Sequence, residues 1–212
     1  MRGSVWLFDL DNTLHNATPH IFPHINRSMR EYIERHLGVD SREANRIRQG
    51  YWERYGATLL GMIRHHAIDP HHFLRETHQF PDLARMIVFE KPLLHTLRRL
   101  PGRKILFSNA PQHYTTAVLA LTGLGRYFDA IYTVESLRFR PKPMPAGFRA
   151  LLRAEGLSAR DCIMVEDSLP NLVTAKKLGM KTVWVNPGQR RSPFVDVHIN
   201  SVLQLPGRCG RL

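Results

Sequence analysis

The sequence predicts an α/β fold in which a Rossmann-like parallel sheet carries a small inserted α-helical domain. Short apolar runs without polar alternation recur along the chain, as in strands that are buried on both faces. Helix-like segments separate the later runs, and this alternation is typical of a parallel sheet. Residues 15–90 show helical periodicity instead, directly after the first apolar run, which indicates an insertion.

Five apolar runs give the predicted strands, which are residues 5–8, 105–107, 130–132, 163–165 and 183–185. Between the later strands we predict three helices, at residues 111–122, 143–155 and 168–178. In the insertion, apolar residues at helical spacing from Phe22 to Leu37 are followed by Gly38, a typical stop signal. The further helices predicted there are 41–55, 58–67 and 70–78. We therefore expect two domains, a sheet core (1–14 and 91–212) and a helical insertion (15–90).

The 212 residues include 30 Lys and Arg but only 18 Asp and Glu, so the formal net charge is +12. This excess indicates an anionic partner without choosing among nucleic acid, a membrane surface and a small phosphate. No apolar stretch approaches the ~18 residues that cross a bilayer, and no secretory segment precedes the first strand. Cys162, predicted to be a buried thiol, and Cys209 do not make a disulfide scaffold. We expect a soluble, cytoplasmic protein.

Three of the predicted strands end on chemically capable residues. The first ends at Asp9, the second at Ser108 and the fourth at Glu166-Asp167. Ligands of open α/β sheets bind outside the carboxyl ends of the strands, so these residues converge if the strands are neighbours. Several carboxylates in one crevice repel one another unless a cation binds them, and oxygen ligands suit Mg²⁺.

The chain carries four motifs in this order: Asp9-x-Asp11-x-Thr13, Ser108-Asn109, Lys142 and Glu166-Asp167. Their order, spacing and strand context resemble those of the haloacid dehalogenase (HAD) superfamily over nearly the whole chain. The resemblance implies a HAD-like sheet core, with residues 15–90 as a cap that covers the site and sets specificity. It also implies Mg²⁺ as cofactor and a phosphorylated small metabolite as substrate.

The resemblance further implies a role for each matching residue. Asp9 would be the nucleophile that forms an aspartyl-phosphate, and Asp11 the general acid and later the general base. Lys142 would neutralise charge on the phosphoryl group and on Asp9, while Ser108 and Asn109 bind phosphate oxygens. The implied metal ligands are Asp9, the backbone carbonyl of Asp11, Asp167 and, directly or through water, Glu166. Asn171 and Thr13 would support these ligands.

Asp11 favours phosphoryl transfer over dehalogenation, because halide leaves without a proton and HAD dehalogenases lack this second acid. A phosphonatase would need a Schiff-base lysine in the insertion, and residues 15–90 contain no lysine. A sugar phosphomutase stays open, as does a basic nucleic-acid-binding protein that keeps a vestigial HAD core. Each motif residue also has a purely structural interpretation, such as Ser108 capping the helix that follows it.

The segment 51–61 is similar to one found in pyrimidine 5′-nucleotidases of this superfamily. That resemblance implies UMP or CMP as substrate, and substrate contacts from Arg54, Tyr55 and Thr58. His15 follows the first motif, where these relatives often have Tyr, and we expect it to face the substrate. A sugar phosphate or phosphoglycolate is the alternative substrate. The structural interpretation of the same segment places Trp52, Tyr55, Leu59 and Leu60 in the core of the cap and Arg54 on its surface. We expect no specific nucleic acid, no membrane contact, and a monomer or homodimer.

Overall fold

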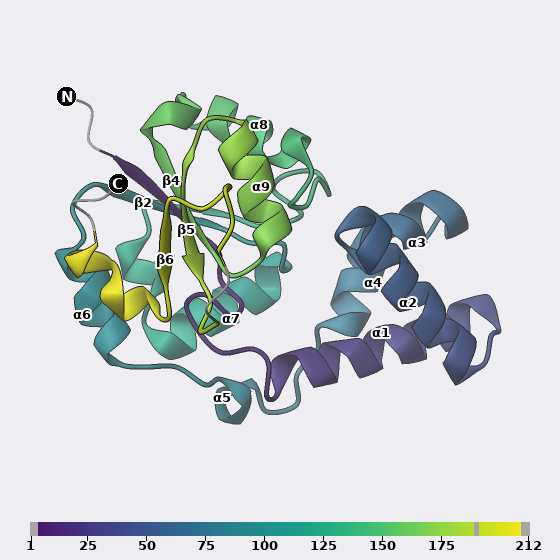
Figure 1. Ribbon diagram of the computed structural model, residues 1–212. Coiled ribbons are helices and arrows are strands. Elements are labelled where there is room, and N and C mark those ends of the chain that lie inside the picture. Colours follow the sequence, from purple (N-terminus) through teal and green to yellow (C-terminus); the bar gives the residue numbers. More distant parts are fainter. Residues whose placement is uncertain (1–3, 189–190, 209–212) are drawn as a thin grey trace. The chain divides into compact units, whose positions relative to one another are not determined.

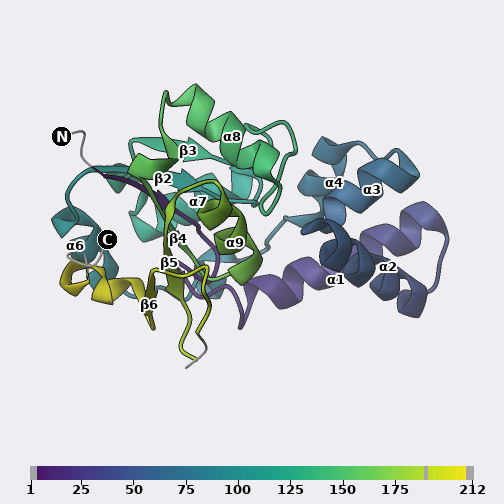
Figure 2. The same cartoon turned by 45° about the horizontal axis from the view of Figure 1, so that its top comes forward.

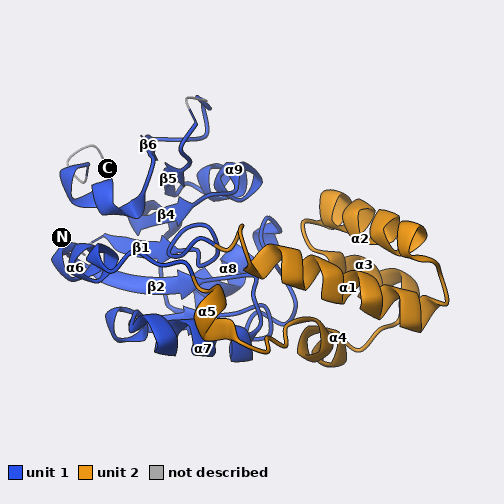
Figure 3. Cartoon of the chain, turned by 90° about the horizontal axis from the view of Figure 1, so that it is seen from below, with its two compact units in different colours: residues 1–16, 88–212 blue, residues 17–87 orange. Residues whose placement is uncertain are grey.

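The computed structural model describes residues 4–188 and 191–208, so Cys209 lies outside the described residues. The chain divides into two compact units (Figure 3). Unit 1 contains residues 1–16 and 88–212, and unit 2 contains residues 17–87. These limits differ by only two or three residues from the domain limits expected above.

Unit 1 is built on a six-stranded sheet in the order β3-β2-β1-β4-β5-β6. Every neighbouring pair of strands is parallel, as predicted (Figure 1). The strands are β1 (Val5–Phe8), β2 (Arg103–Phe107), β3 (Ala130–Tyr132), β4 (Cys162–Glu166), β5 (Lys181–Val185) and β6 (Val197–Ile199). Because β1 pairs with both β2 and β4, the three strands that end on motif residues are neighbours in the sheet.

Helices cover both faces of this sheet (Figure 2). The helices of unit 1 are α6 (Pro92–Arg99), α7 (Gln112–Thr122), α8 (Pro145–Ala154) and α9 (Leu169–Lys177). On one face, the inward side chains of β1, β2 and β4 pack against Phe148 and Leu151 of α8 and Leu172 of α9. Both central strands are buried on their two faces, which explains why β1 and β4 are continuous apolar runs.

Two expectations about the strands were wrong in detail. Residues 130–132 were expected to be buried on both faces, but β3 is an edge strand and Ile131 is 44% exposed. Strand β6 was not predicted, because its three residues include His198 and lie in an irregular stretch. The short helix α6 was also missed, although its Pro92 stands in the first turn, where proline favours a helix start.

Unit 2 is entirely helical in its described secondary structure, as predicted for the insertion. It contains α1 (Ile21–Leu37), α2 (Ser41–Tyr55), α3 (Thr58–His66), α4 (Pro70–Thr77) and the short α5 (Leu83–Met86). Gly38 caps the end of α1, and its φ of 65° is the left-handed conformation that favours glycine. Asp40 caps the start of α2, where its side chain accepts a hydrogen bond from the Glu43 backbone N–H at 2.8 Å.

Across the described part of the chain, none of the helices combines the length and the apolar character needed to cross a membrane.

Candidate active site

The first motif occupies a tight turn at the carboxyl end of β1. The backbone N–H of Asp9 still donates to the Val165 carbonyl at 3.0 Å, which holds Asp9 against the neighbouring strand β4. The Thr13 hydroxyl donates to Asp9 Oδ2 at 3.2 Å and so fixes the carboxylate from within the turn. Asn12 has a φ of 60°, a left-handed conformation that Asn tolerates better than most residues. The structure thus brings Asp9 and Thr13 together as expected.

Lys142 lies at the centre of the site, in the loop between β3 and α8. Its ammonium donates to Asp9 Oδ1 and to Glu166 Oε2, at 2.7 Å each, and its side chain is 1% exposed. Burial alone would lower the pKa of Lys142, but the charges of Asp9 and Glu166 together outweigh burial and raise it. Lys142 is therefore a permanent cation between two motif carboxylates that come from different strands.

Glu166, the last residue of β4, has both carboxylate oxygens engaged. Oε2 accepts from Lys142 and from the Asn171 amide at 2.9 Å. Oε1 accepts from the backbone N–H groups of Asp167 and Ser168, at 3.1 Å each. Burial would raise the pKa of Glu166, yet the charge of Lys142 and these hydrogen bonds lower it below its usual value. Glu166 is thus an anion that positions Lys142, and Asn171 supports it.

Asp9, Glu166 and Asp167 form a compact acidic cluster in which carboxylate oxygens lie within 4.8 Å of one another. Burial, followed by the charge of Glu166, raises the pKa of Asp9 to about 7, against the opposing effect of Lys142. The same two causes raise the pKa of Asp167 to about 9. One lysine therefore leaves the cluster short of positive charge. An all-oxygen donor set with excess negative charge fits a hard divalent cation such as Mg²⁺.

The second motif follows β2 and reaches the same site. The Asn109 side chain accepts from the Lys142 backbone N–H and donates to the Lys142 carbonyl, each at 2.8 Å. This two-way contact fixes the loop that carries the lysine. The Ser108 hydroxyl accepts from the Ala110 N–H at 3.0 Å, while its own proton can still be donated. It does not cap α7, because the N-cap position of that helix is Pro111. Both residues follow the carboxyl end of β2, and Asn109 anchors the loop of Lys142.

Asp11 accepts two hydrogen bonds from side chains. Tyr114, in the first turn of α7, donates to Asp11 Oδ1 at 2.7 Å, and His15 Nε2 lies 2.8 Å from the same oxygen. Burial and the nearby charge of Asp11 raise the pKa of Tyr114, so its hydroxyl remains protonated. The His15 side chain is fully buried, and its described polar contacts are with Asp11 and Tyr114.

The predicted substrate residues of the insertion have different environments within unit 2. Thr58 is buried and its hydroxyl donates to the Arg48 carbonyl at 3.0 Å. This hydrogen bond joins α3 to α2 and gives Thr58 a structural role within unit 2. Tyr55 donates or accepts a hydrogen bond with His65 at 2.7 Å, and the exposed Arg54 guanidinium lies 5.5 Å from the Tyr55 ring centroid. The interpretation of Trp52 as part of a cap core was wrong, because its side chain is 62% exposed.

Three supporting residues were missed in the sequence. They are Tyr114, Trp184, whose indole N–H donates to the Asp167 carbonyl at 2.7 Å, and Thr174, whose hydroxyl donates to the Pro143 carbonyl at 2.8 Å. Of the three, only Tyr114 could have been expected at the site from the sequence, because it lies in the first turn of a helix that begins just after Ser108-Asn109. The other two act through backbone carbonyls, which carry no signal in a sequence.

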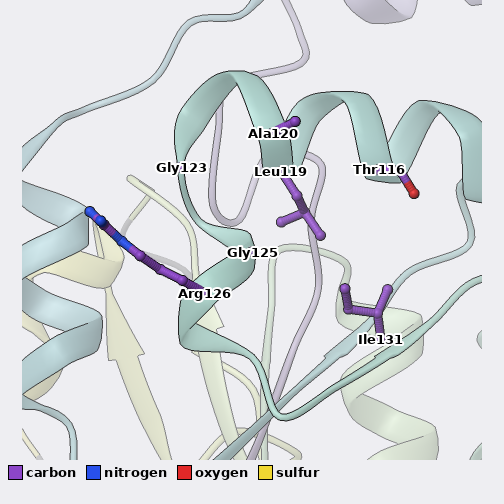
Figure 4. A pocket seen from close by; sticks show the side chains of 7 residues that line it. All are labelled: Thr116, Leu119, Ala120, Gly123, Gly125, Arg126 and Ile131. Atoms are coloured by element: carbon purple, nitrogen blue, oxygen red, sulfur yellow. The ribbon is translucent and has the colours of Figure 1, made fainter.

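A surface hollow of about 540 Å³ lies apart from these residues, between α7, β3 and the short 3₁₀ helix Gly125–Tyr127 (Figure 4). Its lining is mostly apolar and consists of Thr116, Leu119, Ala120, Gly123, Gly125, Arg126 and Ile131. None of these residues belongs to the motifs. The chemistry-bearing residues of unit 1 therefore gather at the carboxyl ends of β1, β2 and β4 and not at this hollow.

Comparisons with known proteins agree with this arrangement. The chain is 25% identical over 190 residues to phosphate metabolism protein 8 of Saccharomyces cerevisiae, a match that covers 83% of this chain. It spans only 59% of that protein's length. It is also 25% identical over 195 residues to a phosphoglycolate phosphatase of Pseudomonas fluorescens, covering 86% of this chain and 69% of the relative.

Among solved structures, a HAD phosphatase from Thermococcus onnurineus superposes with a TM-score of 0.63 at 26% identity, covering 99% of this chain and 98% of that one. A model of the haloacid dehalogenase-like hydrolase family matches residues 5–179. That range begins with β1 and ends just after α9, so it contains all four motifs and the insertion between the first two. On this match and on the geometry of its motifs, the chain belongs to the haloacid dehalogenase-like hydrolases.

Proposed function

We propose that this protein is a Mg²⁺-dependent phosphomonoester hydrolase that works through an aspartyl-phosphate intermediate on Asp9. The observation that carries the proposal is the position of Lys142, whose ammonium lies 2.7 Å from Asp9 Oδ1. A carboxylate that attacks a phosphate dianion must overcome charge repulsion, and a buried cation at the nucleophile lowers that repulsion. The phosphatase-named relatives support the same reaction class.

Each motif residue has its own role in a reaction of two steps. Asp9 attacks phosphorus while the bond from phosphorus to the leaving oxygen breaks, and Asp11 gives that oxygen its proton. In the second step Asp11 takes a proton from water as the water oxygen attacks phosphorus, which releases phosphate and restores Asp9. Ser108, through its hydroxyl, and Asn109, through its backbone N–H, hold phosphate oxygens. Lys142 stays charged throughout.

Asp9, Asp167 and the Asp11 backbone carbonyl are the residues that would hold Mg²⁺. Glu166 is better placed to support them, since its two oxygens already accept four hydrogen bonds. When bound, the cation supplies positive charge that neutralises the phosphate oxygens and the acidic cluster.

Two substrate classes have support. The similarity of residues 51–61 to pyrimidine 5′-nucleotidases favours UMP or CMP, with Arg54 and Tyr55 as the residues that contact the nucleotide. The phosphoglycolate phosphatase among the relatives favours a small carboxylated phosphate instead. Neither has the stronger support, and a sugar phosphate remains a third substrate to compare.

A single panel tests the proposal and separates these substrates. Phosphate release from UMP, CMP, AMP, phosphoglycolate and several sugar phosphates is measured with Mg²⁺ and with excess EDTA, for the wild type and for Asp9→Asn. We expect one class to be hydrolysed, and the loss of that activity in EDTA and in Asp9→Asn. Activity that survives in the variant would contradict the mechanism. Phosphate moved within a sugar, without release, would identify a mutase.

A further inference from the structure

Asp11 is held by two side chains that approach one and the same carboxylate oxygen. The Tyr114 hydroxyl comes from the first turn of α7 and lies 2.7 Å from Oδ1. His15 Nε2 comes from the loop after β1 and lies 2.8 Å from Oδ1. Tyr114 and His15 also lie 3.3 Å apart, so the three groups form a closed triangle that ties the first motif to α7.

The direction of the His15 contact follows from its other ring nitrogen. His15 Nδ1 is buried and has no hydrogen-bond partner among the described residues. The ionised Asp11 carboxylate can only accept, and a proton on Nδ1 would have no acceptor, so the contact with Asp11 is made by a proton on Nε2. That proton points to Asp11. Tyr114 and His15 therefore both act as donors, and Oδ1 is the shared acceptor.

Two donors on one oxygen restrict rotation of the Asp11 carboxylate, and they leave Oδ2 as the oxygen that exchanges a proton. Asp11 keeps 17% of its side chain exposed, while His15 is completely buried behind it. We propose that Tyr114 and His15 are positioning residues for Asp11, which fix Oδ1 so that Oδ2 faces the leaving oxygen of the substrate. The assignment rests on the proposed function, in which Asp11 is the general acid and base.

The assignment gives His15 a role different from the substrate contact that the sequence suggested. A residue that contacts substrate affects KM first, whereas one that aligns a general acid affects kcat and does not raise KM. The size of the effect must also depend on the leaving group. An aliphatic alkoxide needs the proton from Asp11 as it departs, but p-nitrophenolate is a weak base that leaves without one.

The test compares Tyr114→Phe with wild type on glycerol phosphate and on p-nitrophenyl phosphate, both in saturating Mg²⁺. We expect kcat/KM for glycerol phosphate to fall by about tenfold or more, and kcat/KM for p-nitrophenyl phosphate to change by less than about threefold, because kcat/KM reports only the steps up to departure of the leaving group. KM should not rise for either ester. His15→Leu should behave like Tyr114→Phe, while His15→Gln, which retains an N–H donor, should recover part of the loss.

Tyr132→Phe is the matched control, because it also removes a tyrosine hydroxyl that donates to a carboxylate, that of Glu155 at 2.5 Å, outside the motifs. It should leave both activities unchanged. Equal losses in kcat/KM on the two esters for Tyr114→Phe, a rise in KM alone, or no change would overturn the positioning role, since kcat/KM for p-nitrophenyl phosphate reports how much enzyme is folded. A wild type inactive on both esters and on the substrate panel would overturn the proposed function and this assignment with it.

Discussion

The Lys142 ammonium and the Glu166 carboxylate form an ion pair of 2.7 Å in which each side chain is only 1% exposed. This pair joins the loop after β3 to the end of β4, and through Lys142 it reaches Asp9 at the end of β1. Three separate segments of the chain are therefore held together by one cation. Because a buried ion pair is costly to break from one side, the pair links the stability of the core to the geometry of the site.

Removing the cation should destabilise the protein strongly. In Lys142→Met, the carboxylates of Asp9 and Glu166 remain buried without a counter-charge, and we expect a loss of about 3–5 kcal/mol in the free energy of unfolding at pH 7. Urea denaturation measures this loss. The control is Lys176→Met, because Lys176 pairs with Asp196 at 2.5 Å where both side chains are about one-third exposed. The control should lose at most about 1 kcal/mol, and a larger loss there than in Lys142→Met would contradict the argument.

The acidic cluster should make the metal-free protein sensitive to alkali. The raised pKa values of Asp9, about 7, and Asp167, about 9, mean that the folded state holds protons that the unfolded chain has released above about pH 4. These two groups therefore lower stability as pH rises from about 4 towards 9. Thermal melting in EDTA should show Tm falling over this range, and Mg²⁺ at pH 8 should restore much of the loss.

Asp167→Asn separates this effect from other titrating groups. The amide has no charge to bury, so Tm in EDTA should fall less steeply between pH 7 and 9 than in the wild type. Mg²⁺ should also raise Tm less in this variant, since one metal-binding carboxylate is gone. Parallel Tm curves for the two proteins, in EDTA and in Mg²⁺, would show that Asp167 is not the group responsible.

Gly147 should connect helix packing to activity. A Cβ added at Gly147 of α8 would lie 2.2 Å from the Arg140 carbonyl oxygen, in the loop that carries Lys142. Gly147→Ala must therefore move that loop, and we expect a loss of about 1–3 kcal/mol together with a lower kcat. Gly50→Ala in α2 is the control, because nothing lies within 4 Å of its added Cβ. It should stabilise the protein by about 0.5–1 kcal/mol without changing activity.

Cys162 should be inert as long as the protein is folded. Burial, together with the nearby charge of Asp161, raises the pKa of the thiol to about 11, so almost no thiolate exists at pH 8. In a Cys209→Ser background, Ellman's reagent should leave the native protein unlabelled and label one thiol after denaturation. Labelling of the native protein at the rate of a free thiol would show that β4 opens readily.

The sequence was sufficient for the central part of the fold because buried parallel strands leave a strong signal. Val5–Phe8 and the core of Cys162–Glu166 are short, continuous apolar runs that end on acidic residues, and both the strands and their chemistry could be predicted. Strand Ala130–Tyr132 gave the same signal but lies at an edge, a property that depends on strand order and not on composition. The three residues of β6 were too few to form a pattern.

Part of the candidate site could also be predicted from the sequence, and part could not. Asp9, Lys142 and the Glu166-Asp167 pair follow strand ends or a recognisable motif, so their convergence could be expected from topology. The hydrogen-bond partners of each residue could not be predicted, because they depend on how side chains from different helices, strands and loops point towards one another. Glu166 was expected near a metal and lies in the acidic cluster, but the sequence did not indicate that its oxygens accept from Lys142 and three other donors. For His15 the sequence suggested a place near the substrate but not the contact of its ring with Asp11.

The position of β1 in the sheet has a consequence for how the chain is made. Val5 pairs with Arg103 of β2 on one side and with Cys162 of β4 on the other. Strand β1 therefore emerges from the ribosome long before β2 or β4 has been synthesised. Its four apolar residues must wait without strand partners through synthesis of the whole insertion. Long loop closure and nonlocal parallel pairing are slow, and they prolong the time during which apolar segments are exposed. Assembly of the sheet is thus a late event, and the nascent chain acquires its acidic cluster only after β4 has emerged.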